Sequence, residues 1–184
     1  MNWLKDIVRR KQPATRVTTL HDPLVIPAPR LRFLNLIGPA AASQLADDKA
    51  ALCHLFHDNQ ELHEIEPCDV LMLYTNVQDD GRALKRIVEK SQAPIVVVAS
   101  ENTGEAYVKA STSEPQKYTN LVLTISRNGE AFDHFFRDLF GKMFKGTTMP
   151  VAWVELAPQG PGPEHTDAPE SIFACGAGHI RFET

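Results

Sequence analysis

Polar side chains follow three apolar segments of the chain, at the point where each segment ends. They are Thr75, Asn76, Asp79 and Asp80 in the first group, Ser100 and Glu101 in the second, and Ser126, Arg127 and Asn128 in the third. If the segments are parallel strands, their carboxyl ends meet at one edge of a sheet, where such folds bind ligands. We therefore expect these side chains to converge on one small polar ligand. Asp79, Glu101 and Arg127 are the candidate catalytic residues, and the other six are candidate ligand-binding residues.

Each of these positions also has a purely structural interpretation. Asn, Asp and Ser are the residues that strand-to-helix turns and helix caps require. Glu101 and Arg127 are not needed as caps, which favours a site. Because no complete catalytic constellation can be assembled, our leading hypothesis is a non-enzymatic interaction or regulatory module. The alternative is a small hydrolase or transferase with a polar active site at the carboxyl edge of the sheet.

The motifs of nucleotide and metal sites are absent from the sequence. Gly38 stands alone after the first apolar segment, and neither GxGxxG nor GxxxxGK[ST] occurs. His54 and His57 are three residues apart and could share a zinc ion on one face of a helix, but no HExxH or paired CxxC accompanies them. A solvated helix end explains these histidines better. We expect neither a cofactor nor a metal.

The three cysteines indicate a reduced protein. An odd number without short pairing distances is not a secreted disulfide framework, and no signal peptide or apolar run of roughly 18 residues is present, so we expect a cytoplasmic protein. Cys175 could act as a nucleophile with His165 or His179 as its base. Only nine residues follow Cys175, and a small buried cysteine beside a glycine-containing bulge is the favoured interpretation.

The charge is concentrated at the amino terminus. The chain has 184 residues and a net charge of −4; residues 1–16 hold five basic residues against one acidic residue, so the remainder carries −8. This balance excludes a whole-chain footprint for nucleic acid. Apolar residues at helical spacing, namely Trp3, Leu4, Ile7 and Val8, predict a short N-terminal helix. A helix of about three turns is not stable alone, so its apolar face must pack against another surface. That surface could be its own domain, a partner protein or an anionic membrane surface.

The remaining pattern alternates between strands and helices. Apolar runs predict strands at 31–37, 69–74, 94–99, 121–125 and 150–156. Helical spacing predicts helices over 40–58, 81–90 and 104–110 and an aromatic-rich one from about 128 to 144. Two short segments, 171–174 and 179–182, form a terminal strand pair or a bent edge strand. A Pro-rich loop covers 158–169.

These elements predict an α/β fold. Strands that are apolar on both faces and separated by helices indicate a doubly wound, mainly parallel five-stranded sheet, a flavodoxin-like three-layer sandwich. We assign residues 30–184 to this single domain and 1–29 to an N-terminal helix with a Pro-rich connector. A partner protein is expected on the N-terminal helix, and an exposed remainder of the aromatic-rich helix, such as Phe144, would favour a homodimer.

Overall fold

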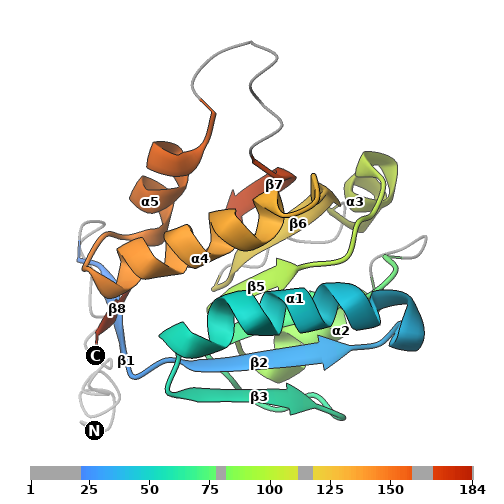
Figure 1. The fold of residues 1–184 in the computed structure, drawn as a ribbon, viewed down its shortest axis with the longest axis horizontal. Helices are drawn as coiled ribbons and strands as arrows, with labels where there is room; N and C mark the ends of the chain where they lie inside the picture. The colour runs from blue at the N-terminus through green and yellow to red at the C-terminus, as the bar shows by residue number, and fades with distance from the viewer. Residues whose placement is uncertain (1–21, 78–81, 112–117, 159–167, 184) are drawn as a thin grey trace, which may run out of the picture.

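A six-stranded sheet forms the centre of the molecule (Figure 1). The computed structural model describes residues 22–77, 82–111, 118–158 and 168–183. The strands are β2 (Arg30–Asn35), β3 (Asp58–Leu62), β4 (Val70–Tyr74), β5 (Ile95–Val98), β6 (Asn120–Ser126) and β7 (Glu170–Cys175). Their order is β3-β2-β4-β5-β6-β7, in which the first five are parallel and β7 is antiparallel to β6. The predicted mainly parallel sheet is confirmed.

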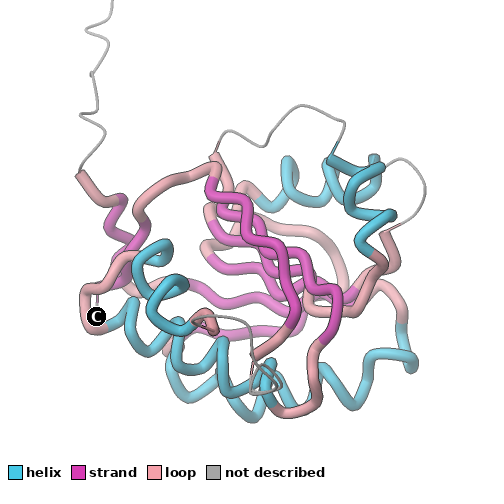
Figure 2. The backbone as a smooth tube through the Cα atoms, turned by 90° about the horizontal axis from the view of Figure 1, so that it is seen from above, coloured by secondary structure: helices cyan, strands magenta, loops and turns pink. Residues whose placement is uncertain are grey.

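Helices cover both faces of the sheet (Figure 2). One face carries α1 (Ala42–Leu52), α4 (Ala131–Phe144) and α5 (Met149–Leu156), and the other carries α2 (Arg82–Ser91) and α3 (Gly104–Ser111). The central strands β4 and β5 are buried at every position. Their uninterrupted apolar runs follow from this double cover, since both faces of each strand contact helices. No helix in these ranges is long and apolar enough to cross a membrane.

The predicted fifth strand at 150–156 is wrong, because this segment is the helix α5. A short apolar run does not distinguish a strand from a buried helix by periodicity. Pro150 lies in the first turn, where its fixed φ favours a helix. Met149 and Ala152, three residues apart, are buried against the core, and the ring of Trp153 lies 4.9 Å from that of Phe135.

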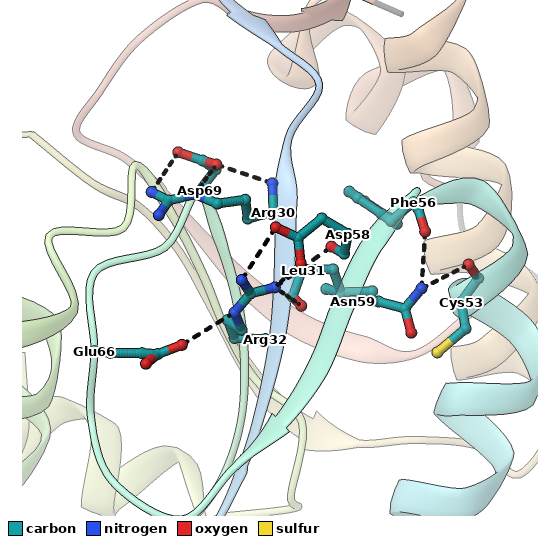
Figure 3. A network of polar contacts seen from close by, with 9 residues as sticks. All are labelled: Arg30, Leu31, Arg32, Cys53, Phe56, Asp58, Asn59, Glu66 and Asp69. Atoms are coloured by element: carbon teal, nitrogen blue, oxygen red, sulfur yellow. Dashed lines mark hydrogen bonds and ion pairs between the residues drawn. The ribbon is translucent and has the colours of Figure 1, made fainter.

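The sequence pattern did not predict β3, because it contains almost no apolar residue. The predicted helix 40–58 ends early: a 3-10 turn precedes α1 (η1, Gly38–Ala41), another follows it (η2, Cys53–Leu55), and the chain then extends. Buried Arg32 on β2 holds the new strand through Asp58, with N···O distances of 2.7 and 3.2 Å, and also bonds Glu66 (Figure 3). The Asn59 side chain donates to two carbonyl oxygens of the preceding turn. A buried charge, rather than apolar alternation, therefore positions this edge strand.

The two ends of the described chain pair with each other. β1 (Leu24–Pro27) and β8 (Ile180–Glu183) form a separate parallel two-stranded sheet, so part of the predicted connector is a strand. Of the two alternatives for the C-terminus, the edge strand is confirmed in β7, and a hairpin between β7 and β8 is not formed. The predicted N-terminal helix and most of the Pro-rich loop lie outside the described residues. The division of the chain at residue 30 remains a prediction.

We predict that Phe182→Ala destabilises the fold by about 3–5 kcal/mol, although it lies close to the C-terminus. Phe182 is 1% exposed, and its ring lies 4.9 Å from that of Phe144 and 5.7 Å from that of Phe56. The exposed neighbour Glu183→Ala serves as the control and should cost less than about 0.5 kcal/mol. Urea unfolding followed by circular dichroism measures both. Equal unfolding free energies for the two variants would contradict this packing.

Candidate functional site

Two of the three candidate catalytic residues lie together at the carboxyl edge of the sheet. Glu101 follows β5 and Arg127 follows β6, and a Glu101 carboxylate oxygen accepts a hydrogen bond from the Arg127 backbone N–H at 2.7 Å. Asp79 lies outside the described residues. The catalytic role expected for these residues stays a prediction.

The Arg127 guanidinium points into the protein and is 7% exposed. Its two terminal nitrogens donate to both carboxylate oxygens of Asp48 at 2.6 and 3.1 Å, to the Ala99 carbonyl at 2.9 Å and to Asp133 at 3.0 Å. The guanidinium carbon also lies 3.8 Å from the centroid of the Phe132 ring, a cation–π contact. Burial by itself would lower the pKa of Arg127, but the hydrogen bonds and charges of the two carboxylates outweigh it and raise that pKa. Arg127 is therefore a fixed structural cation.

Asp48, which sequence reasoning missed, is the central acceptor of this network. It lies on α1, is fully buried, and also accepts a hydrogen bond from the Tyr74 hydroxyl on β4. Burial, together with the Asp48 charge, raises the pKa of Tyr74, so the hydroxyl keeps its proton and donates. Asp48 lies three residues after Leu45 and four before Leu52, within the buried stripe of α1. A carboxylate on the buried face of a helix must be paired with another polar group. The position of Asp48 within an apolar stripe was therefore the sequence feature that could have revealed this contact.

Asp133, in the first turn of α4, is the second missed residue. Its pKa is raised to about 7, first by burial and then by the neighbouring Asp48 carboxylate. Arg127 acts in the opposite direction. Asp133 accepts one hydrogen bond from the guanidinium, whereas Asp48 accepts two. The effect of Arg127 on the pKa of Asp133 is smaller than that of burial. A pKa of about 7 places the Asp133 carboxyl between its protonated and ionised forms near neutral pH.

Two predicted ligand-binding residues are used to join neighbouring loops. Thr75 is buried; its N–H donates to the Ser100 hydroxyl oxygen at 2.9 Å, and the Ser100 hydroxyl donates to the Thr75 carbonyl at 2.6 Å. The Asn102 side chain completes this contact, since it donates to the Thr75 carbonyl and accepts from the Val77 N–H. These polar groups bond one another instead of facing a ligand.

The third group shapes the turn before α4. Asn128 has a φ of 52°, a left-handed conformation that Asn tolerates better than most residues. Its side chain accepts from the Ser126 hydroxyl at 2.9 Å and donates to the Ala168 carbonyl at 2.7 Å, which joins the turn to the start of β7. Of the remaining candidates, Asn76 is exposed and Asp80 lies outside the described residues. Not all of the side chains that we expected to meet at one ligand therefore lie together.

A cleft of about 720 Å³ lies beside this network, between α1 and α4. Its carboxylates are Asp47, Glu101, Glu130 and Asp133, and we call it the acidic cleft. His134 and Arg137 also line it, and Arg137 is paired with its neighbour Asp138 at 3.0 Å. Among the described residues that line it, none is a serine, threonine, cysteine or lysine. The side chains present can pair with cationic side chains or transfer protons, but they supply no hydroxyl, thiol or amine nucleophile.

The described histidines and cysteines form no metal-binding cluster. No group of three or more His, Cys, Asp or Glu side chains in the described ranges could hold a metal ion. His54 lies in η2 and His57 precedes β3, so the predicted common helix face is wrong. Cys175 is exposed rather than buried as predicted, and its thiol contacts the Gly178 carbonyl at 3.7 Å. The His179 ring contacts Thr148, and His165 lies outside the described residues.

We predict that stability conferred by Asp133 falls as the pH rises from about 4 to about 7. The folded pKa of about 7 lies above the ordinary value of 3.8, so the folded state retains a proton that the unfolded state has released in this interval. Relative to Asp133→Asn, the wild type should lose roughly 1–3 kcal/mol across the window, at no more than about 1.4 kcal/mol per pH unit. Urea unfolding at a series of pH values measures this difference. Asp138→Asn, exposed on the same helix, is the control, and parallel pH profiles for wild type and Asp133→Asn would contradict the shifted titration.

The carboxyl edge of the sheet thus combines an internally bonded Arg127 network with an open acidic cleft. The network orders the ends of β4, β5 and β6 and the start of α4. Glu101 and Asp133 belong to both the network and the cleft, and the cleft adds the carboxylates of Asp47 and Glu130. Comparisons with protein-family models, with curated proteins and with solved structures found no match to this chain.

Proposed function

We propose that the chain is a non-enzymatic interaction or regulatory module that recognises a positively charged segment of a partner protein in the acidic cleft. The observation that carries this proposal is the four hydrogen bonds of the Arg127 guanidinium to Asp48, Ala99 and Asp133. Because of these hydrogen bonds, the buried guanidinium is paired inside the protein and is not directed at a ligand. The groups left facing the cleft are mostly carboxylates.

The charge of the cleft determines the class of ligand. Asp47, Glu101 and Glu130 are exposed, and the two arginines that line the same cleft, Arg127 and Arg137, are already paired. A cationic side chain entering the cleft would meet carboxylates from α1, from the loop after β5 and from the start of α4. Such complementarity accelerates association and selects partners by charge. A Lys- or Arg-rich segment satisfies this requirement.

The arrangement of the strands agrees with a binding edge at this position. We propose a flavodoxin-like topology for the parallel part of the sheet, because numbering β2 to β6 along the chain gives the order 2-1-3-4-5. Two features depart from that arrangement: no helix joins β3 to β4, and β7 is antiparallel. The basic N-terminal helix remains the predicted second contact with a partner.

A small hydrolase or transferase is the second candidate, and Asp133 is the observation that favours it. A carboxyl that lines a cleft and has a pKa of about 7 has the property of a general acid or base. His134, adjacent in sequence, also lines the cleft. In this case Asp133→Asn would abolish turnover of a substrate from a panel of esters, phosphate esters and glycosides while binding persists.

We predict that the full chain binds a fluorescein-labelled decapeptide containing four arginines, and that the affinity falls with added salt because opposite charges attract. The double variant Asp47→Lys, Glu130→Lys should weaken binding at least tenfold, about 1.4 kcal/mol. Fluorescence anisotropy gives the dissociation constants.

The matched control is Glu89→Lys, which reverses an exposed carboxylate on α2, on the opposite face of the sheet. It should leave binding within about twofold of wild type, which is within roughly 0.5 kcal/mol. If the cleft variant and Glu89→Lys weaken binding equally, the peptide responds to net charge alone and the cleft is not its site. A substrate turned over by wild type but not by Asp133→Asn would instead establish the enzyme.

A further inference from the structure

A second hollow lies on α4, beyond the acidic cleft. It has a volume of about 730 Å³ and is bordered by the C-terminal half of α4, by η2 and by the end of α5. Arg137 lines both spaces, so the two follow one another along the same helix. The polar side chains around this second space are mostly basic, namely His54, Arg137, Lys142 and Lys145, and we call it the basic hollow.

The floor of the basic hollow is apolar and held in place by the core. Leu55, Phe144 and Leu156 are partly buried, line the hollow, and pack against the core cluster on their inner side. The Phe144 ring lies 5.2 Å from Phe56 and 4.9 Å from Phe182, and both of these rings are almost completely buried. A fixed apolar surface of this kind can receive a large apolar side chain without rearranging.

Gly141 makes the hollow deeper. It lies in the interior of α4, where glycine is less favourable than alanine. A Cβ placed on Gly141 would meet no atom within 4 Å, and its φ is not in the left-handed region, so neither close packing nor backbone conformation requires glycine. The space above Gly141 opens into the basic hollow. Because Gly141 has no side chain, it leaves space for an occupant that lies across the helix.

The charges of the rim select an anionic occupant. Lys142 is bonded to Glu155 at 2.8 Å and Arg137 to Asp138 at 3.0 Å, and exposed ion pairs of this kind are worth little and can be exchanged. No carboxylate of the described residues lies within ion-pair distance of Lys145. Cations also suit the C-terminus of α4, but that preference accounts neither for the apolar floor nor for Gly141.

We propose that the basic hollow binds an acidic segment of a partner protein through one large apolar side chain seated over Gly141. That side chain packs on Phe144 and Leu156, and the acidic residues on either side of it pair with Lys142 and Lys145. The concave shape suits a peptide better than the flat surface of a membrane. Residues 1–16 of this chain carry +4 and would be repelled. This site goes beyond the acidic cleft and has the opposite charge preference.

The test uses the full chain and a fluorescein-labelled dodecapeptide of glutamates and glycines with one central phenylalanine. We expect saturable binding by anisotropy, and Lys145→Glu should weaken it at least fivefold. Lys90→Glu is the matched control, because it changes an exposed lysine in the last turn of α2, on the opposite face. Its effect should be less than twofold. No binding up to the solubility limit, or equal losses in the two variants, would overturn the proposal.

Substitutions at Gly141 separate an effect on peptide binding from an effect on folding. Gly141→Ala should raise the melting temperature, since alanine favours the helix. Gly141→Leu should leave the protein folded, because its side chain extends into open space, yet reduce binding of the phenylalanine peptide at least tenfold. A peptide with alanine in place of phenylalanine should bind weakly and be insensitive to Gly141→Leu. Undiminished binding of the phenylalanine peptide to Gly141→Leu would place it elsewhere and overturn the proposal.

Two further measurements distinguish the basic hollow from the acidic cleft and from a membrane-binding surface. The double variant Asp47→Lys, Glu130→Lys should not weaken binding of the acidic peptide. The binding proposal for the acidic cleft and the binding proposal for the basic hollow can therefore fail independently. Vesicles containing phosphatidylserine form the second comparison. If Lys145→Glu abolishes vesicle binding and leaves peptide binding intact, the basic residues face a membrane and the peptide proposal fails.

Discussion

The buried ion pair between Arg127 and Asp48 determines the organisation of the carboxyl edge. Arg127 follows β6 and Asp48 lies on α1, 79 residues apart in the sequence, and the guanidinium also bonds the end of β5 and the first turn of α4. Removing either partner would leave a charge buried without compensation, which typically costs about 3–5 kcal/mol. This pair therefore positions α1 and α4 relative to each other, and with them the acidic cleft between the two helices.

The polar groups at this edge divide into buried ones, which bond one another, and exposed ones, which face solvent. Arg127, Thr75 and Ser100 are bonded internally, so residue types that suggested chemistry stabilise the loops. The exposed groups lie along α4, acidic near its start and basic near its end. Both groups also suit the helix dipole, but the dipole accounts neither for Gly141 nor for the apolar floor beside Phe144. A single helix thus carries acidic side chains near its start and basic side chains near its end.

The sequence predicted those elements whose formation depends on local apolar pattern. The buried runs of β4 and β5 and the helices α3 and α4 were found because periodicity and turn residues agreed. β3 was missed because Arg32, on another strand, holds it, and α5 was mistaken for a strand because a short apolar run has no distinctive period. Glu101 and Arg127 were placed at this edge by their positions after strands, but the pattern gave no indication that the Arg127 guanidinium is buried. Asp133 was missed because its proximity to Asp48 arises only when α1 and α4 pack together.

A double-mutant cycle on Asp48 and Arg127 tests whether Arg127 is a structural cation whose charge is neutralised by Asp48 inside the fold. The unfolding free energies of wild type, Asp48→Asn, Arg127→Leu and the double variant give the coupling between the two side chains. We predict a coupling of about 2–4 kcal/mol, so that the double variant is far more stable than the sum of the single losses implies. Additivity to within about 0.5 kcal/mol would show that Asp48 does not neutralise Arg127 in the fold, and would leave Arg127 free to act on a ligand.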